Sequence, residues 1–227
     1  MEYKEVINKM KSLENPKNVE GMARYGINPK NNLGLSVATV RSIAKEIGKD
    51  HDLALKLWDS GIRDARMLAA HVDDPEKVTE EQMEKWVLDF NSWDVCDNAC
   101  GHLFDKTKFS YKKATEWSNR SEEFVKRAGF ALMAWLATHD KKSDDRKFEE
   151  FLEIIKREAT DERNYVRKAV NWALRNIGKR KLTLNKKAIK TAEEIKKIDD
   201  RTARWNANDA IRELTSEKVQ ERLTKKK

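Results

Sequence analysis

The first residues that suggest chemistry are a tryptophan and an aspartate four positions apart. Trp93 and Asp97 lie in the segment Trp93–Phe104, whose apolar residues recur at helical spacing. On a helix, this spacing places the Asp97 carboxylate one turn from the indole, at the border between an apolar and a polar face. Aspartate is unfavourable inside a helix because its side chain competes for backbone hydrogen bonds. Two interpretations remain open: Asp97 is a half-solvated surface residue, or it is an anion placed to act on a ligand.

A second tryptophan lies among cations further along the chain. In Tyr165–Ile177, Trp172 points away from the apolar stripe of the helix and lies beside Lys168 and Arg175. This combination is typical of aromatic stacking together with phosphate contacts, and packing against an adjoining helix is the alternative. Lys168, Arg175 and Lys179 have the spacing of one helix face. We predict that they contact the phosphates of a nucleic acid.

Arg127 lies near the start of the segment Phe124–Ala137. No charged residue follows Arg127 within this segment. A helix that is apolar nearly all round is buried between its neighbours. Because a cation near a helix N-terminus is opposed by the helix dipole, Arg127 needs an anionic partner. A carboxylate of the preceding repeat and a phosphate both fit, and an Arg127 side chain that reaches solvent at the rim of the core is the alternative.

Helices must position these side chains. The 227 residues include 38% charged residues, 8 glycines and 3 prolines, a composition that favours helix over a fold with many turns. Five segments of mixed basic and small apolar residues begin about 30 to 40 residues apart, the period of two-helix solenoid repeats. These segments are Ile62–Val72, Trp93–Phe104, Phe124–Ala137, Tyr165–Ile177 and Arg201–Leu214. An irregular helical bundle is the alternative.

Helix caps support these assignments. Ser36 precedes an apolar-periodic run that ends at Gly48, so we expect an N-cap at Ser36 and a helix stop at Gly48. Thr79, with Gln82 three residues later, predicts a capping box. We predict one domain over residues 1–227, with a basic tail at about 225–227.

The charge balance suggests the class of partner. A formal net charge of +8 and a pI of about 9.3 favour a polyanionic partner.

Cys96 and Cys100 are the only cysteines, and with His102 they lack a fourth metal ligand, so we expect buried thiols and no metal. The charged N-terminus has no secretory signal and no apolar run is long enough for a membrane, which predicts a soluble cytoplasmic protein. No phosphate-binding loop or dinucleotide motif is present, and no cofactor is expected.

Several segments match a known family in their order and spacing. They are Met22–Tyr25, Leu33–Gly34, Ser92–Asp97, Val125–Ala128 and Val166–Arg175. On these residues the sequence resembles the AlkD-like alkylpurine DNA glycosylases, over most of the chain. The resemblance implies an all-α, HEAT-like helical-repeat solenoid with a concave basic face.

The resemblance also implies roles for individual residues. Asp97 would act on the sugar, Trp93 and Trp172 would flank the damaged nucleotide, and Arg127 would hold the DNA backbone near the lesion. Tyr25 matches a family aromatic near the site. The match around Ser36 is loose, and a phosphate contact at that helix N-terminus is an expectation only.

These roles predict a hydrolase that removes cationic N3- or N7-alkylated purines from duplex DNA in base excision repair. The expected partner is double-stranded DNA that carries alkylated purines, bound by a monomer that is nucleoid-associated while it is on DNA. The alternative is a non-catalytic HEAT-like protein that binds bent, branched or damaged DNA. A HEAT-like protein–protein scaffold is a third hypothesis, because a fold does not determine a function.

Overall fold

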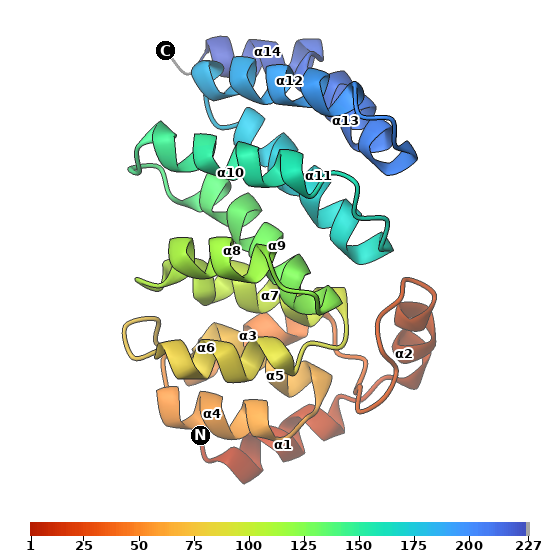
Figure 1. Cartoon of the computed structure of the whole chain (residues 1–227). Helices are drawn as coiled ribbons and strands as arrows, with labels where there is room; N and C mark the ends of the chain where they lie inside the picture. Colours follow the sequence, from red (N-terminus) through yellow and green to blue (C-terminus); the bar gives the residue numbers. More distant parts are fainter. Residues whose placement is uncertain (226–227) are drawn as a thin grey trace. The chain divides into compact units, whose positions relative to one another are not determined.

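The computed structural model describes residues 1–225 of the chain, and those residues form helices joined by turns and loops, with no strand (Figure 1). The prediction of an all-α fold is therefore confirmed. Lys226 and Lys227 of the predicted basic tail lie outside the described residues. None of the helices between residues 1 and 225 is long and apolar enough to cross a membrane.

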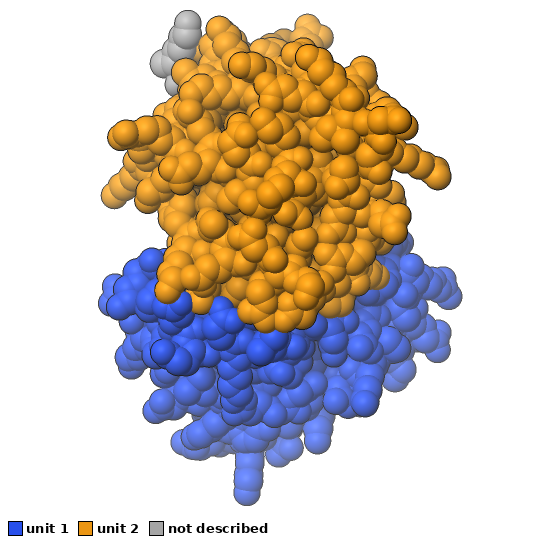
Figure 2. All heavy atoms as spheres, in the orientation of Figure 1, with its two compact units in different colours: residues 1–109 blue, residues 110–227 orange. Residues whose placement is uncertain are grey.

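The chain divides into two compact units, residues 1–109 and residues 110–227 (Figure 2). The helices of unit 1 are α1 (Tyr3–Ser12), α2 (Pro16–Ala23), α3 (Val37–Ile47), α4 (His51–Asp59), α5 (Arg63–Val72), α6 (Glu80–Leu88), α7 (Trp93–His102) and the 3-10 helix η1 (Phe104–Lys106). Those of unit 2 are α8 (Ser110–Ser118), α9 (Glu123–His139), α10 (Asp145–Arg157), α11 (Asn164–Gly178), α12 (Leu182–Lys196), α13 (Arg201–Leu214) and α14 (Glu217–Thr224). A single domain over residues 1–227 stays a prediction.

All five segments of the predicted repeat are helices, namely α5, α7, α9, α11 and α13. Helix α7 ends earlier than its predicted segment, at His102 instead of Phe104, because Leu103 leaves helical geometry (φ −131°, ψ −63°). The chain then continues as η1, whose Phe104 side chain is fully buried. The apolar pattern of the sequence thus extends to Phe104, although the α-helical backbone ends at His102.

The caps form largely as expected. The Ser36 side chain accepts a hydrogen bond from the Thr39 N–H (3.1 Å) at the start of α3, and Gly48 ends that helix at φ 75°. The Thr79 side chain accepts from the Gln82 N–H (3.1 Å), which is half of a capping box. In the other half, the Gln82 side chain would accept from the Thr79 N–H, but this side chain is held by the Asp73 carboxylate, to which its Nε2 donates a hydrogen bond (2.6 Å). A tertiary contact has displaced a local one.

Each unit has its own core. In unit 1, the indoles of Trp58 and Trp86 stack with 3.9 Å between ring centroids, and α5 packs against α3, α4 and α7. In unit 2, α9 packs between α8 and α11. Residues 128–134 of α9 are all buried, which confirms the prediction of a helix enclosed by its neighbours. Cys96 and Cys100 are buried in α7, as expected.

Candidate nucleic-acid interface

A pocket in unit 1 brings together three of the residues singled out from the sequence. Trp93 at the start of α7, Tyr25 just after α2 and Ser36 before α3 all line it. The pocket measures about 510 Å³. Its full lining is Lys17, Asn18, Gly21, Met22, Tyr25, Ile27, Ser36 and Trp93. An apolar wall beside an indole and a lysine can accept a planar group attached to an anionic backbone.

A hydrogen bond from the indole joins α7 to the end of α2. The Trp93 Nε1–H donates to the main-chain carbonyl of Tyr25 (2.9 Å), 68 positions earlier in the sequence. The Tyr25 side chain is itself 77% exposed. Because the polar edge of the Trp93 ring is already bonded, the ring offers its apolar surface to the pocket. The exposed Tyr25 side chain can contact a ligand in the pocket that it lines.

Asp97 lies on α7, one turn after Trp93, and is half-buried. Residues four positions apart lie on the same side of a helix, so Asp97 and Trp93 share one side of α7. Its neighbours on the helix, Val95, Cys96, Ala99 and Cys100, are buried. Asp97 therefore lies at the border between core and solvent that the sequence predicts.

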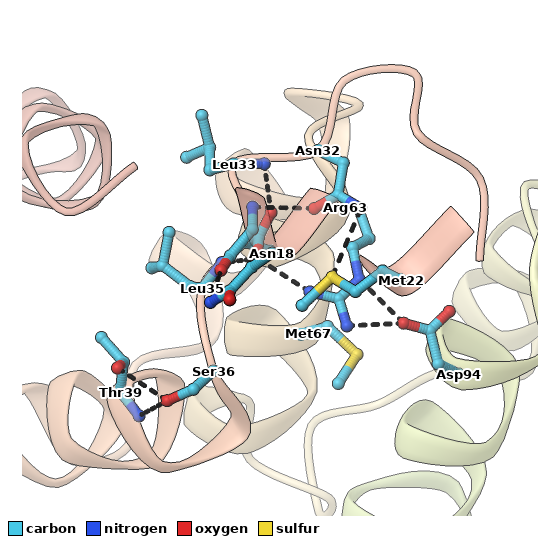
Figure 3. Close-up of polar contacts among 12 residues, drawn as sticks. Asn18, Met22, Asn32, Leu33, Leu35, Ser36, Thr39, Arg63, Met67 and Asp94 are labelled. Carbon is cyan, nitrogen blue, oxygen red and sulfur yellow. Dashed lines mark hydrogen bonds and ion pairs between the residues drawn. The ribbon is translucent and has the colours of Figure 1, made fainter. Parts of the chain in front are cut away.

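A buried ion-pair network holds the first turn of α7 in place (Figure 3). The Arg63 guanidinium, at the start of α5, donates to the Asp94 carboxylate through Nε (2.8 Å) and Nη2 (2.6 Å). It also donates to the Asp64 carboxylate through Nη1 (2.8 Å). Asp64 in turn accepts from the N–H groups of Leu33 (2.7 Å) and Leu35 (2.9 Å). One network thus fixes α5, α7 and the segment that leads to Ser36.

Sequence reasoning missed this network, although a signal for it exists. The bonds from Leu33 to Asp64 and from Arg63 to Asp94 each span 31 positions. The bond from the Asn98 side chain to the Met67 carbonyl (3.1 Å) spans 31 positions as well. This separation falls within the period of the predicted repeat. A search for opposite charges one repeat apart would have found Arg63 and Asp94.

Ser36 is engaged within its own helix. Its Oγ accepts from the Thr39 N–H, and the Thr39 hydroxyl lies 2.8 Å away (Figure 3). The hydroxyl thus caps α3 while it lines the pocket. A phosphate contact by Ser36 stays a prediction.

Arg127 lies in unit 2, on α9, and is buried with 6% of its surface exposed. Its Nη1 donates to the main-chain carbonyl of Tyr165 (2.7 Å) at the start of α11. This bond ties the N-terminal part of α9 to the first turn of α11. A role for Arg127 in holding DNA backbone stays a prediction.

Trp172 combines the two alternatives that the sequence left open. It is half-buried on α11 and packs edge-to-face against Trp135 of α9, with centroids 5.4 Å apart and an interplanar angle of 82°. The same indole lines a pocket of about 300 Å³ within unit 2. The lining of this pocket is Trp135, Ala137, Thr138, Lys141, Trp172, Asn176, Lys179, Arg180 and Arg222. Trp172 therefore both packs on the adjoining helix and faces a cation-rich hollow.

Two of the three predicted phosphate ligands already have acidic partners. Arg175 and Lys179 both form ion pairs with Glu213 of α13, and the bond from Lys179 is 2.6 Å long. Burial raises the pKa of Glu213, but hydrogen bonds from Lys179 and Arg175 lower it more, so this pKa lies below its ordinary value. Lys168 is exposed on α11. A phosphate bound by Arg175 or Lys179 would share these cations with the Glu213 carboxylate, because each bond to Glu213 uses only one of their N–H donors.

Comparisons with known proteins identify the family of the chain. The profile of the DNA alkylation repair enzyme family matches residues 6–214. Two uncharacterized proteins, from Listeria innocua and Listeria monocytogenes, are each 25% identical over 193 residues, which is 83% of this chain and 84% of theirs.

A solved structure shows the same fold. It has a TM-score of 0.83 and 20% identity, and it covers 98% of this chain and 96% of its own. It is described as a new family of proteins related to the HEAT-like repeat DNA glycosylases with affinity for branched DNA structures. The HEAT-like fold expected from the sequence is confirmed, and the chain belongs to the DNA alkylation repair enzyme family.

Proposed function

We propose that this protein is a DNA glycosylase that hydrolyses the N-glycosidic bond of cationic N3- and N7-alkylated purines in duplex DNA. The observation that carries the proposal is the pairing of Trp93 and Asp97 on α7, with the indole lining a pocket. Membership of the DNA alkylation repair enzyme family supports it. Asp97 has the central role.

The chemistry of the lesion explains why one carboxylate is enough. A purine alkylated at N3 or N7 carries a positive charge and leaves without further protonation. The remaining barrier is the positive charge that develops on deoxyribose and the attack of water on that sugar. A carboxylate beside the sugar stabilises this charge and can orient or deprotonate the water. This is the anionic half of a glycosidase pair without the general acid.

The aromatic groups add selectivity for charge. A tryptophan face attracts a cation by about 0.5–2 kcal/mol, depending on desolvation. Trp93 would favour a cationic nucleotide, or a sugar that is becoming cationic, over undamaged DNA. Neutral lesions lack this attraction and the built-in leaving-group activation. We therefore expect excision of neutral lesions to be much slower.

The test is the release of free N7-methylguanine and N3-methyladenine from methylated duplex DNA. Asp97→Asn keeps the size of the side chain and removes its charge, so it should lower the single-turnover rate by about 10²- to 10³-fold, the usual loss for one transition-state contact. Asp52→Asn, on the exposed start of α4, removes the same charge as a matched control and should leave the rate unchanged. An Asp97→Asn variant with an unchanged rate and a normal circular dichroism spectrum would contradict the assignment.

A second function has a specific observation in its favour. The protein with the same fold at a TM-score of 0.83 is described as having affinity for branched DNA. A non-catalytic binder of branched DNA would release no base from any substrate. It would bind a four-way junction more tightly than a linear duplex, and Asp97→Asn would change neither affinity by much. Measuring base release and junction affinity on the same preparation separates the two functions.

A further inference from the structure

The solvent-facing side of α13 combines arginines with an exposed tryptophan. Arg201, Arg204, Trp205, Asn208 and Arg212 are all exposed and recur at helical spacing on one face. Trp205 is 40% exposed, which is unusual for a large aromatic side chain. Asp209 lies at the edge of this face and pairs with Arg212.

A guanidinium from α11 covers one side of this indole. The Cζ atom of Arg167 lies 5.0 Å from the centroid of the Trp205 ring. The guanidinium itself has weak protein partners. Its Nη2 makes a long hydrogen bond to the Asn164 side chain (3.5 Å), and its buried Nε meets no hydrogen-bond partner among residues 1–225. Arg167 is thus positioned by the ring while its donors remain largely unused.

The arginine that precedes Trp205 in the sequence is also weakly held. Arg204 pairs with Asp199 (2.7 Å), whose side chain is fully exposed. An ion pair in this setting is strongly screened by solvent and exchanges readily with another anion. Arg167 and Arg204 therefore both have donor capacity for a phosphate next to Trp205.

The repeat relates this surface to the residues predicted to bind DNA. Helix α11 begins at Asn164 and α13 begins at Arg201, so Arg167 and Arg204 are the fourth residues of the two helices. Lys168 and Trp205 are correspondingly the fifth residues. The position that carries a phosphate-binding candidate in α11 thus carries an indole in α13. One repeat later, the same face offers a stacking surface in place of a cation.

We propose that the surface formed by Arg167, Lys168, Arg204 and Trp205, named here the α11–α13 surface, binds unpaired DNA. A base would stack on Trp205, and the phosphates beside it would bind Arg167 and Arg204. A single strand is the occupant that fits, because its bases expose their faces and its backbone is anionic, whereas a duplex hides its base faces. The inference rests on the proposed function, since it adds a strand-binding site to a protein that we propose acts on duplex DNA.

The experiment compares two DNA probes that share one duplex. One is blunt, and the other has a single-stranded tail of about six nucleotides, within the span that stacking sites occupy. Each carries 2-aminopurine, placed in the tail of the second probe, because stacking on an indole quenches its fluorescence. Trp205→Ala should weaken binding of the tailed probe by about tenfold, abolish the quenching and change blunt-duplex binding by less than about twofold. Trp205→Phe should retain most of the tail affinity.

Charge and stacking are then separated by salt. Arg204→Gln should reduce the slope of log affinity against log salt by about 1 for the tailed probe. Arg146→Gln removes an exposed arginine, likewise paired with an aspartate, from the start of α10 and is the matched control, with no effect on tail preference expected. Since Trp205 is exposed, its substitutions should leave the melting temperature unchanged, and this is checked for each variant.

The outcomes distinguish this inference from the proposed function. If the wild-type protein binds both probes and Trp205→Ala binds the tailed probe equally well, the α11–α13 surface does not bind single strands and the inference is overturned. If the wild-type protein binds neither probe at any salt, the proposed function itself fails.

Discussion

Removal of the Arg63 side chain should loosen the support of the unit 1 pocket. Arg63 is only 7% exposed and donates three hydrogen bonds to two carboxylates. Those carboxylates, Asp64 and Asp94, are 0% and 7% exposed. Arg63→Met has a similar volume but no charge, so it leaves two negative groups buried without their cation. The substitution therefore tests an electrostatic support and not simply packing.

The magnitude follows from the burial of the network. Removing one partner of a buried ion pair costs about 3–5 kcal/mol, because the other charge stays desolvated. A domain typically has about 5–15 kcal/mol of stability, so the loss is a large part of the total. With a urea dependence of about 2 kcal/mol per molar, the midpoint of unfolding should fall by roughly 1.5–2.5 M.

The assay combines urea titration with hydrogen exchange. In Arg63→Met, the amides of Leu33 and Leu35 should exchange faster, because their acceptor Asp64 has lost its main partner. Adding Asp94→Asn to Arg63→Met should recover part of the stability, since it removes one of the two unpaired charges. Lys85→Met, which breaks an exposed pair with Asp59, is the control and should change little.

Two results would refute this reasoning. A midpoint shift for Arg63→Met no larger than that of Lys85→Met would mean that the network contributes little. Strict additivity of Arg63→Met and Asp94→Asn would mean that the two side chains are not coupled, although Arg63 donates to Asp94 at 2.6 Å and 2.8 Å.

Two further predictions concern packing and pH. A Cβ added at Gly129 would lie 2.5 Å from the backbone nitrogen of Ser118, so Gly129→Ala should lower the stability of unit 2 by about 1–3 kcal/mol in a thermal melt. Gly21→Ala meets nothing within 4 Å and should be neutral or stabilising. Burial and the charge of Arg41 lower the pKa of His71 to about 4 from 6.5, with Lys106 and Lys49 acting in the same direction and a hydrogen bond with Asn98 opposing them. As the pH drops from 6.5 towards 4, the His71 imidazole is protonated in the unfolded chain before it is protonated in the folded protein, so the free energy of unfolding should fall. His71→Gln should reduce this fall, and urea midpoints measured across the same pH range check it.

Local patterns in the sequence were enough to predict the helices. The N-caps at Ser36 and Thr79, the stop at Gly48 and the enclosure of α9 all follow from neighbouring residues. Where prediction was incomplete, a distant residue intervened. The Gln82 side chain does not complete the capping box because it donates a hydrogen bond to Asp73, which lies on the preceding segment. A helix N-cap contributes about 1 kcal/mol to stability, and a hydrogen bond to a buried carboxylate contributes more.

The electrostatic partners show the same division. Arg175 and Lys179 share a helix face, as their spacing indicates, but their ion pairs with Glu213 join residues 34 to 38 positions apart. Spacing along one helix gives no information about the acid that a neighbouring helix presents. The cations that remain weakly held, Arg167 and Arg204, likewise emerge only when α11 and α13 are seen together.

The sequence alone determined the all-helical class, the repeat period and the placement of Trp93 one turn before Asp97, because hydrophobic periodicity and side-chain direction are local properties of a helix. The tertiary structure decided that Trp93 meets the carbonyl of Tyr25 and that Arg63 neutralises Asp94. Such contacts depend on which helix surfaces of successive repeats pack against each other. The contributions of these contacts to stability arise from burial, and the side chains of a segment become buried only when other segments pack against it.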